Sequence, residues 1–188
     1  KTHGPMLGSS KSIKIFEKGI QNAKIEPNSV DAIITSPPYG VEAISYLRTH
    51  LLSYRSLANI LEHDPYSNSS EIIGSEYIDK DSKAEHLASK YSETYTKFFK
   101  KYDLDNAPKK LQQRTEMMMK FFDDMALTAK SFKKWLRKGG KVAFVVGNKR
   151  LGDFIIPTHK IITEVFAGFG LIEVETIKHK LKTNNANS

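Results

Sequence analysis

The sequence contains no cysteine among its 188 residues. This absence excludes disulfide bonds, zinc sites built from thiolates and enzymes that use a cysteine nucleophile. No apolar run approaches the roughly 18 residues that a membrane-spanning helix needs, and no charged-then-apolar segment of the signal-peptide kind opens the chain. We therefore expect no membrane partner. The lack of cysteine is compatible with a reducing cytoplasm, which is the location we expect.

Acidic residues are outnumbered by basic ones. The chain has 29 Lys and Arg against 21 Asp and Glu, which gives a formal net charge of +8. Excess positive charge favours a polyanionic partner such as nucleic acid, since each neutralised phosphate releases condensed counterions. Solubility alone explains the same excess in many small basic domains. The hydrophobic content of 39% is too high for a wholly disordered chain and suits one globular domain.

Composition divides the chain into zones. The first zone holds an alternating segment at residues 12–16 and a β-branched run at residues 30–35, and both patterns are typical of strands. The second zone, residues 41–114, is helical in character and interleaves aromatic with basic residues. It is therefore expected to be a helical insertion and a DNA-recognition region. Residues 1–10 and 179–188 are turn-rich or polar without a pattern, so we expect irregular ends.

The third zone returns to alternating elements. Four of its segments have the pattern of a regular element, and in chain order they are a helix at 118–136, a strand at 142–147, a helix at 157–169 and a strand at 171–177. Gly139 and Gly140 are expected to end the first of these helices. This order of elements predicts the α/β class, with a mostly parallel sheet and the helical insertion described above.

One short segment carries specific chemistry. The predicted strand at residues 30–35 runs directly into Ser36-Pro37-Pro38-Tyr39. Two prolines fix two backbone angles and remove two N–H donors, which leaves carbonyl oxygens free to accept hydrogen bonds from a ligand. Ligands of open α/β sheets bind at this end of a strand. Carbonyl acceptors, a hydroxyl and an aromatic ring suit a planar base with an exocyclic amino group. The alternative is a turn in which two prolines simply end a strand.

Residues 28–39, which read Asn-Ser-Val-Asp-Ala-Ile-Ile-Thr-Ser-Pro-Pro-Tyr, resemble catalytic motif IV of the S-adenosylmethionine-dependent DNA amino-methyltransferases. The serine-first version is most similar to the cytosine-N4 group, whereas adenine-N6 enzymes more often begin the motif with Asp or Asn. Residues 135–148 are similar to the family's helix, Gly-Gly turn and core strand, and residues 156–170 to its next helix and turn. The resemblance covers roughly residues 12–40 and 115–178.

The resemblance implies a partial Rossmann-like methyltransferase sheet within a catalytic domain at residues 11–178. It also implies direct methyl transfer to the amino group of a base flipped out of double-stranded DNA, in an enzyme of the restriction-modification type. Ser36 and the Pro37 carbonyl would orient the amine, Pro38 completes the motif, and Tyr39 would stack on the base. Cytosine N4 is the expected target. The alternatives are adenine N6 and a non-catalytic DNA-recognition or assembly subunit that keeps the fold.

The family's glycine-rich cofactor loop is missing from this chain. For S-adenosylmethionine, the resemblance leaves Glu17, as a displaced acid after a strand, and Thr35, which precedes the motif. We therefore expect a second chain or a separate segment to carry the glycine-rich motif and complete the cofactor site.

Basic residues of the insertion are the candidates for contact with DNA phosphates. They form two groups, namely Arg48, His50 and Arg55 on a helix after the motif, and Lys100, Lys101, Lys109 and Lys110 in a cluster with aromatic residues. A solvated helix face is the alternative for both groups. His159 and His179 have no partners at metal-ligand spacing, so no metal site is expected and both are interpreted as surface histidines.

Overall fold

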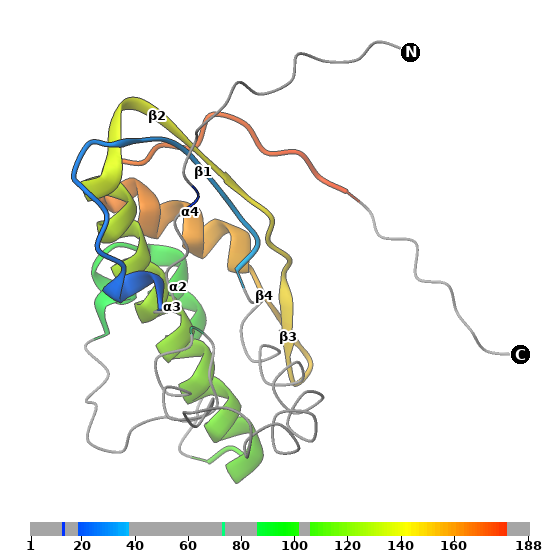
Figure 1. Ribbon diagram of the computed structural model, residues 1–188. Coiled ribbons are helices and arrows are strands. Elements are labelled where there is room, and N and C mark those ends of the chain that lie inside the picture. The colour runs from blue at the N-terminus through cyan, green and yellow to red at the C-terminus, as the bar shows by residue number, and fades with distance from the viewer. Residues whose placement is uncertain (1–12, 14–18, 38–72, 74–85, 102–105, 180–188) are drawn as a thin grey trace, which may run out of the picture.

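The computed structural model of the chain describes residues 13, 19–37, 73, 86–101 and 106–179. In chain order the elements are η1 (Ile20–Asn22), β1 (Val30–Thr35), η3 (Leu87–Lys90), α2 (Glu93–Lys100), α3 (Lys109–Trp135), β2 (Leu136–Phe144), β3 (Lys149–Leu151), β4 (Phe154–Ile156) and α4 (Thr158–Gly168). Figure 1 shows the helices gathered on one side of the β1–β2 pair. The protein is thus α/β, as the sequence predicts.

Strands β1 and β2 pair in parallel, although they are far apart in the sequence. Ala32 lies opposite Lys141, and the register continues to Thr35 opposite Phe144. A register shift interrupts the ladder between Val30 and Ala32. Parallel strands need a crossover connection, and α2 and α3 lie in the chain between these two strands.

Helix α3 supplies most of the core. Its buried apolar residues recur at spacings of three and four, as the sequence predicts, and are Met118, Phe121, Phe122, Met125, Ala126, Ala129, Phe132 and Trp135. The ring of Phe132 lies 5.9 Å from that of Phe144 in β2 and 6.0 Å from that of Phe166 in α4. The rings of Phe144 and Phe166 are 5.0 Å apart. This aromatic cluster fixes the sheet onto both helices.

The prediction that Gly139 and Gly140 end the helix is wrong. Helix α3 ends at Trp135, and Leu136 is already extended, with φ −67° and ψ 133°. Both glycines belong to β2, where Gly139 has a φ of +80°. A side chain on Gly140 would crowd the carbonyl oxygen of Val30, at 3.2 Å. The glycines therefore let β2 approach β1 closely near the register shift, because only glycine fits both conditions without strain.

The predicted strand at residues 142–147 is confirmed in part, since β2 begins earlier and ends at Phe144. The predicted strand at residues 171–177 is wrong. This segment forms neither helix nor strand, and Ile172 and Val174 are 78% and 92% exposed. Its alternating pattern suits a strand, but a strand needs a partner, and none of the described residues pairs with it.

One predicted boundary of the insertion does not coincide with the end of an element. The predicted insertion ends at residue 114, which falls inside the continuous helix α3. Most of that insertion, and nearly all of the segment at residues 12–16, lies outside the described residues. Strands β3 and β4 form an antiparallel hairpin that the sequence interpretation did not include. None of the helices in the described part of the chain has the length and apolar character that a membrane span requires.

Candidate functional site

The carboxyl ends of β1 and β2 lie at one edge of the sheet. Thr35, the last residue of β1, pairs with Phe144, the last residue of β2. The carbonyl oxygen of Thr35 accepts a hydrogen bond from the Val145 backbone N–H at 3.1 Å, so the chains stay side by side beyond the strands. Ser36 and Pro37 therefore leave the sheet at this carboxyl edge, where ligands of open α/β sheets bind.

The structure describes two of the four predicted catalytic residues. Ser36 is exposed and Pro37 is buried. A buried proline anchors the segment to the body of the molecule, while the neighbouring serine stays accessible to a ligand. Pro38 and Tyr39 lie outside the described residues.

The two predicted cofactor residues have different outcomes. Thr35 is half-buried, and its carbonyl oxygen is engaged by Val145 as described above. Its side chain is then the group left to contact a ligand. Glu17 lies outside the described residues.

A polar pair lies beyond the end of β2, where the sequence interpretation placed only an ordinary surface histidine. The ring Nδ1 of His159 lies 2.9 Å from Oδ1 of Asn148. With this oxygen assigned as the acceptor, the ring carries a proton on Nδ1, and the neutral ring keeps its lone pair on Nε2. The segments that follow β2 thus carry an oriented imidazole.

The β3–β4 hairpin explains how this pair forms. Lys149 pairs with Ile156, so the segments that flank the hairpin are brought together. Gly152 occupies the turn with a φ of +59°, a conformation that glycine adopts without strain. A Gly-Asp turn between apolar residues was therefore the signal that could have revealed both the hairpin and the proximity of Asn148 to His159.

The predicted DNA contacts do not form one described cluster. Lys100 and Lys101 lie at the end of α2, Lys109 and Lys110 begin α3, and all four are exposed. Lys100 lines a shallow hollow of about 240 Å³ together with Met119 of α3. Met119 is about 13 Å along the helix from Lys110 at a rise of about 1.5 Å per residue. The two lysine pairs therefore lie at different levels of α3. Outside the described residues lie Arg48, His50 and Arg55.

One face of the β1–β2 sheet is bare. Ile33 packs against the core, whereas its neighbour Ile34 is 84% exposed and Val145 is 60% exposed. Parallel sheets are normally covered on both faces, and a sheet of two strands is rarely stable by itself. No element among the described residues covers this outer face. The sheet therefore has room for further structure on it.

Glu164 of α4 is the best-connected carboxylate, and it serves the fold. It accepts hydrogen bonds from the Ser92 hydroxyl at 2.7 Å and from the Thr94 backbone N–H at 3.0 Å. Burial alone would raise the pKa of Glu164, but hydrogen bonds from Thr94 and Ser92 outweigh it, so the pKa is lowered. Ser92 in turn caps α2 by accepting from the Tyr95 N–H. Glu164 therefore stays ionised and holds the N-terminus of α2 against α4.

Three other ionisable side chains of the described residues are buried, namely Asp123, Tyr95 and Asp124, and the last of these pairs with Lys120 at 2.8 Å. Asp123 is buried and accepts a hydrogen bond from the Ala88 N–H at 2.9 Å. Burial, and then the nearby charge of Asp123, raises the pKa of Tyr95 far above its ordinary value. Tyr95 therefore stays protonated and is unsuited to act as a base. Within the described residues, no group of three or more histidine or acidic side chains is arranged to hold a metal ion.

Comparisons of the chain with protein-family models, with curated proteins and with solved structures found no match. The function must therefore be inferred from the carboxyl edge itself. Its described groups, the Thr35 and Ser36 hydroxyls and the Pro37 carbonyl, are uncharged hydrogen-bonding groups at the end of a parallel strand pair.

Proposed function

We propose that this chain forms the target-base half of an S-adenosylmethionine-dependent DNA amino-methyltransferase that modifies cytosine N4. The observation that supports it most is the position of Ser36 and Pro37, which leave the carboxyl edge of a parallel sheet directly after β1. A methyltransferase motif at any other place in an α/β fold would not face a ligand.

The residues of the motif suit an exocyclic amine. Pro37 has no N–H donor, so the residue presents only a hydrogen-bond acceptor, its carbonyl oxygen, to a ligand. The Ser36 hydroxyl accepts a second hydrogen bond. The amino nitrogen of cytosine is a poor nucleophile because its lone pair is delocalised into the ring. Hydrogen bonds that hold both N–H groups favour a tetrahedral nitrogen and align it for attack.

The described residues do not fit the whole cofactor. The carboxyl edge, at residues 35–37 and 145–148, contains no carboxylate for the cofactor's ribose and contains one glycine, Gly147. A site for the ribose and methionine parts therefore has to come from another segment or chain. The bare outer face of the sheet, with Ile34 and Val145 exposed, supports such a partner and a larger Rossmann-like sheet.

Two alternatives belong to the same proposal. Adenine N6 presents the same kind of amine, so the identity of the modified base has to be measured. A non-catalytic DNA-recognition subunit is favoured by the same lack of cofactor groups at the carboxyl edge. Restriction-modification in the cytoplasm is the setting in which we place either form.

The test of this proposal identifies which base is methylated. DNA is incubated with labelled S-adenosylmethionine, this chain and a chain that carries the glycine-rich motif, taken from the flanking reading frame. The DNA is then digested and its nucleosides are separated by mass spectrometry. We expect N4-methylcytosine, and we expect Ser36→Ala to lower turnover about 10- to 100-fold because one oriented hydrogen bond is lost.

Ser29→Ala is the matched control. Its hydroxyl is exposed and donates to the Glu26 carbonyl oxygen at 2.6 Å, before β1 begins. Turnover should be unchanged in this variant. N6-methyladenine as the sole product would reject the cytosine assignment, and equal losses in both variants would reject the role of Ser36. If the complex binds DNA but transfers no labelled methyl group to it, the non-catalytic subunit is favoured.

A further inference from the structure

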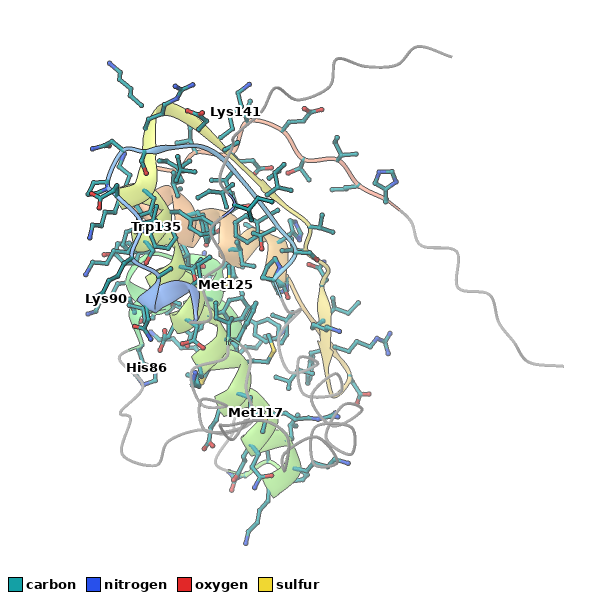
Figure 2. All side chains as sticks on the ribbon, viewed as in Figure 1. His86, Lys90, Met117, Met125, Trp135 and Lys141 are labelled. Carbon is teal, nitrogen blue, oxygen red and sulfur yellow. The ribbon has the colours of Figure 1, made fainter. Side chains whose placement is uncertain are left out.

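Basic residues gather at the end of the molecule opposite the carboxyl edge. Helix α3 passes into β2 without a linker, and Trp135 and Leu136 anchor this junction in the core, at 4% and 6% exposure. Six exposed basic residues flank the junction, namely Lys130, Lys133, Lys134, Arg137, Lys138 and Lys141. We call this set the junction patch. Figure 2 shows Trp135 and Lys141 at the same end of the molecule, with Met117 at the other.

The arrangement of the junction patch follows from the two elements that carry it. Lys130, Lys133 and Lys134 are spaced three and four apart, so they share one face of α3. The others belong to the first residues of β2. At about 1.5 Å per helical residue, Lys130 to Lys134 covers about 6 Å of α3, and at about 3.3 Å per strand residue, Arg137 to Lys141 covers about 13 Å of β2.

Few acids balance these charges. Arg137 pairs with Asp31 at 2.6 Å, but both side chains are largely exposed, so the pair contributes little. None of the five lysines of the patch forms an ion pair with another described residue. Its positive charge is therefore available to an external anion.

Stabilisation of the helix explains only part of the patch. Lys133 and Lys134 lie in the last turn of α3, where cations interact favourably with the helix dipole. That effect falls off within one turn, so it does not account for Lys138 and Lys141, which lie in β2. A cation row that continues past the helix end suits an extended polyanion.

The neighbouring apolar residues argue against a membrane surface. Insertion into a lipid surface needs exposed apolar side chains beside the basic ones. Trp135 and Leu136 are buried, and Leu127, one turn before Lys130, is only 39% exposed. Ile34 shares the outer face with Lys141, but it lies two residues beyond Ala32, the partner of Lys141, toward the carboxyl edge.

We propose that the junction patch binds the phosphate backbone of double-stranded DNA, independently of base sequence and apart from the carboxyl edge. Duplex DNA carries about one charge per 1.7 Å with both strands counted, so the strand part of the patch, about 13 Å long, lies beside about eight phosphate charges. Val30 at the start of β1 and Thr35 at its end are about 17 Å apart at about 3.3 Å per residue. One duplex lying along the strands can therefore reach both the patch and the candidate base site. The choice of DNA among polyanions rests on the proposed function.

The test measures binding of two unrelated labelled duplexes to the full chain by fluorescence anisotropy, over a series of salt concentrations. The patch variant carries Lys134→Gln, Lys138→Gln and Lys141→Gln. We expect it to reduce the slope of log K against log salt by about 2–3, because each lost phosphate contact removes about 0.9 from that slope. The reduction should be the same for both duplexes.

The matched control removes the same charge elsewhere, with Lys97→Gln, Arg150→Gln and Lys160→Gln, all at exposed positions. Its slope should stay close to that of the unsubstituted chain, and circular dichroism should show both variants folded. A second patch variant with Glu at the same positions should abolish binding at moderate salt.

Equal slopes for the patch variant and the unsubstituted chain would overturn the proposal, as would equal reductions in patch and control. If the patch variant loses binding to anionic phospholipid vesicles while its salt slope for DNA is unchanged, the patch binds a membrane instead. If the patch variant reduces the salt slope more for duplex RNA than for duplex DNA, the choice of DNA is overturned. The salt slope tests the junction patch, and the methylated base tests the proposed function. Failure of one proposal can therefore be distinguished from failure of the other.

Discussion

Glu164 shows how one side chain joins two helices. Its carboxylate collects donors from Ser92 and Thr94 at the start of α2, although it belongs to α4. Hydrogen bonds of this kind favour the charged form, which is why the pKa of Glu164 is lowered despite its partial burial. The packing of α2 on α4 is therefore linked to pH.

The direction of that linkage follows from the lowered pKa. Ionised Glu164 stabilises the fold fully above its ordinary pKa of 4.5, and this contribution is lost as the pH falls through the lower pKa of the folded state. We expect Glu164→Gln to lower the free energy of unfolding by about 1–2 kcal/mol near neutral pH. The difference should shrink below about pH 4.

Urea unfolding of both proteins at several pH values measures this difference. Glu116→Gln, at an exposed position of α3, is the control and should match the unsubstituted chain throughout. A Glu164→Gln difference that grows toward low pH would contradict the assigned direction.

At the scale of elements, strand β1 separates two environments. Ile33 packs against the core on the helix side, and Ile34 is exposed on the outer face. Successive side chains of a strand point to opposite faces, so these neighbours test the two faces of the sheet directly.

We expect Ile33→Ala to lower the free energy of unfolding by about 1–3 kcal/mol, since a packed side chain is removed. Ile34→Ala should change it by less than about 0.5 kcal/mol in the chain alone, as for other exposed positions. Paired urea titrations measure both. If Ile34→Ala is the more damaging of the two, the outer face is already covered in the isolated chain.

The whole molecule presents its candidate base site at one end of the sheet and its junction patch at the other. The proposed base-binding groups lie where a parallel sheet places ligands, while the described residues of that edge offer no carboxylate for the cofactor. Positioning is demanding, because misplacement of reacting groups by about 1 Å lowers rates on the order of 100-fold. Half of such a site is therefore expected to be inactive.

We expect this chain alone to give no heat of binding with S-adenosylmethionine in isothermal titration and to leave DNA unmethylated. Binding should appear when the chain that carries the glycine-rich motif is added. Robust methylation by the isolated chain would disprove the half-site, and continued absence of binding in the mixture would favour the non-catalytic subunit.

The elements whose pattern is local and unambiguous could be predicted from the amino-acid sequence. The β-branched run of β1, the apolar stripe of α3 and the proline before α4 specify their conformations through neighbouring residues. The placement of Ser36 at the end of β1 followed from the sequence as well, because the two prolines after Ser36 end a strand locally.

Features that depend on a partner distant in the sequence became visible in the folded chain. A Gly-Gly pair ends a helix or lets two strands approach, and the contact of Gly140 with Val30 selects the second role. The alternation at residues 171–177 suits a strand, yet without a paired neighbour its backbone forms no ladder. Asn148 and His159 meet through the β3–β4 hairpin, and the junction patch exists because α3 ends at Trp135 against the core. Each of these depends on atoms that are remote in sequence, so no local pattern contains them.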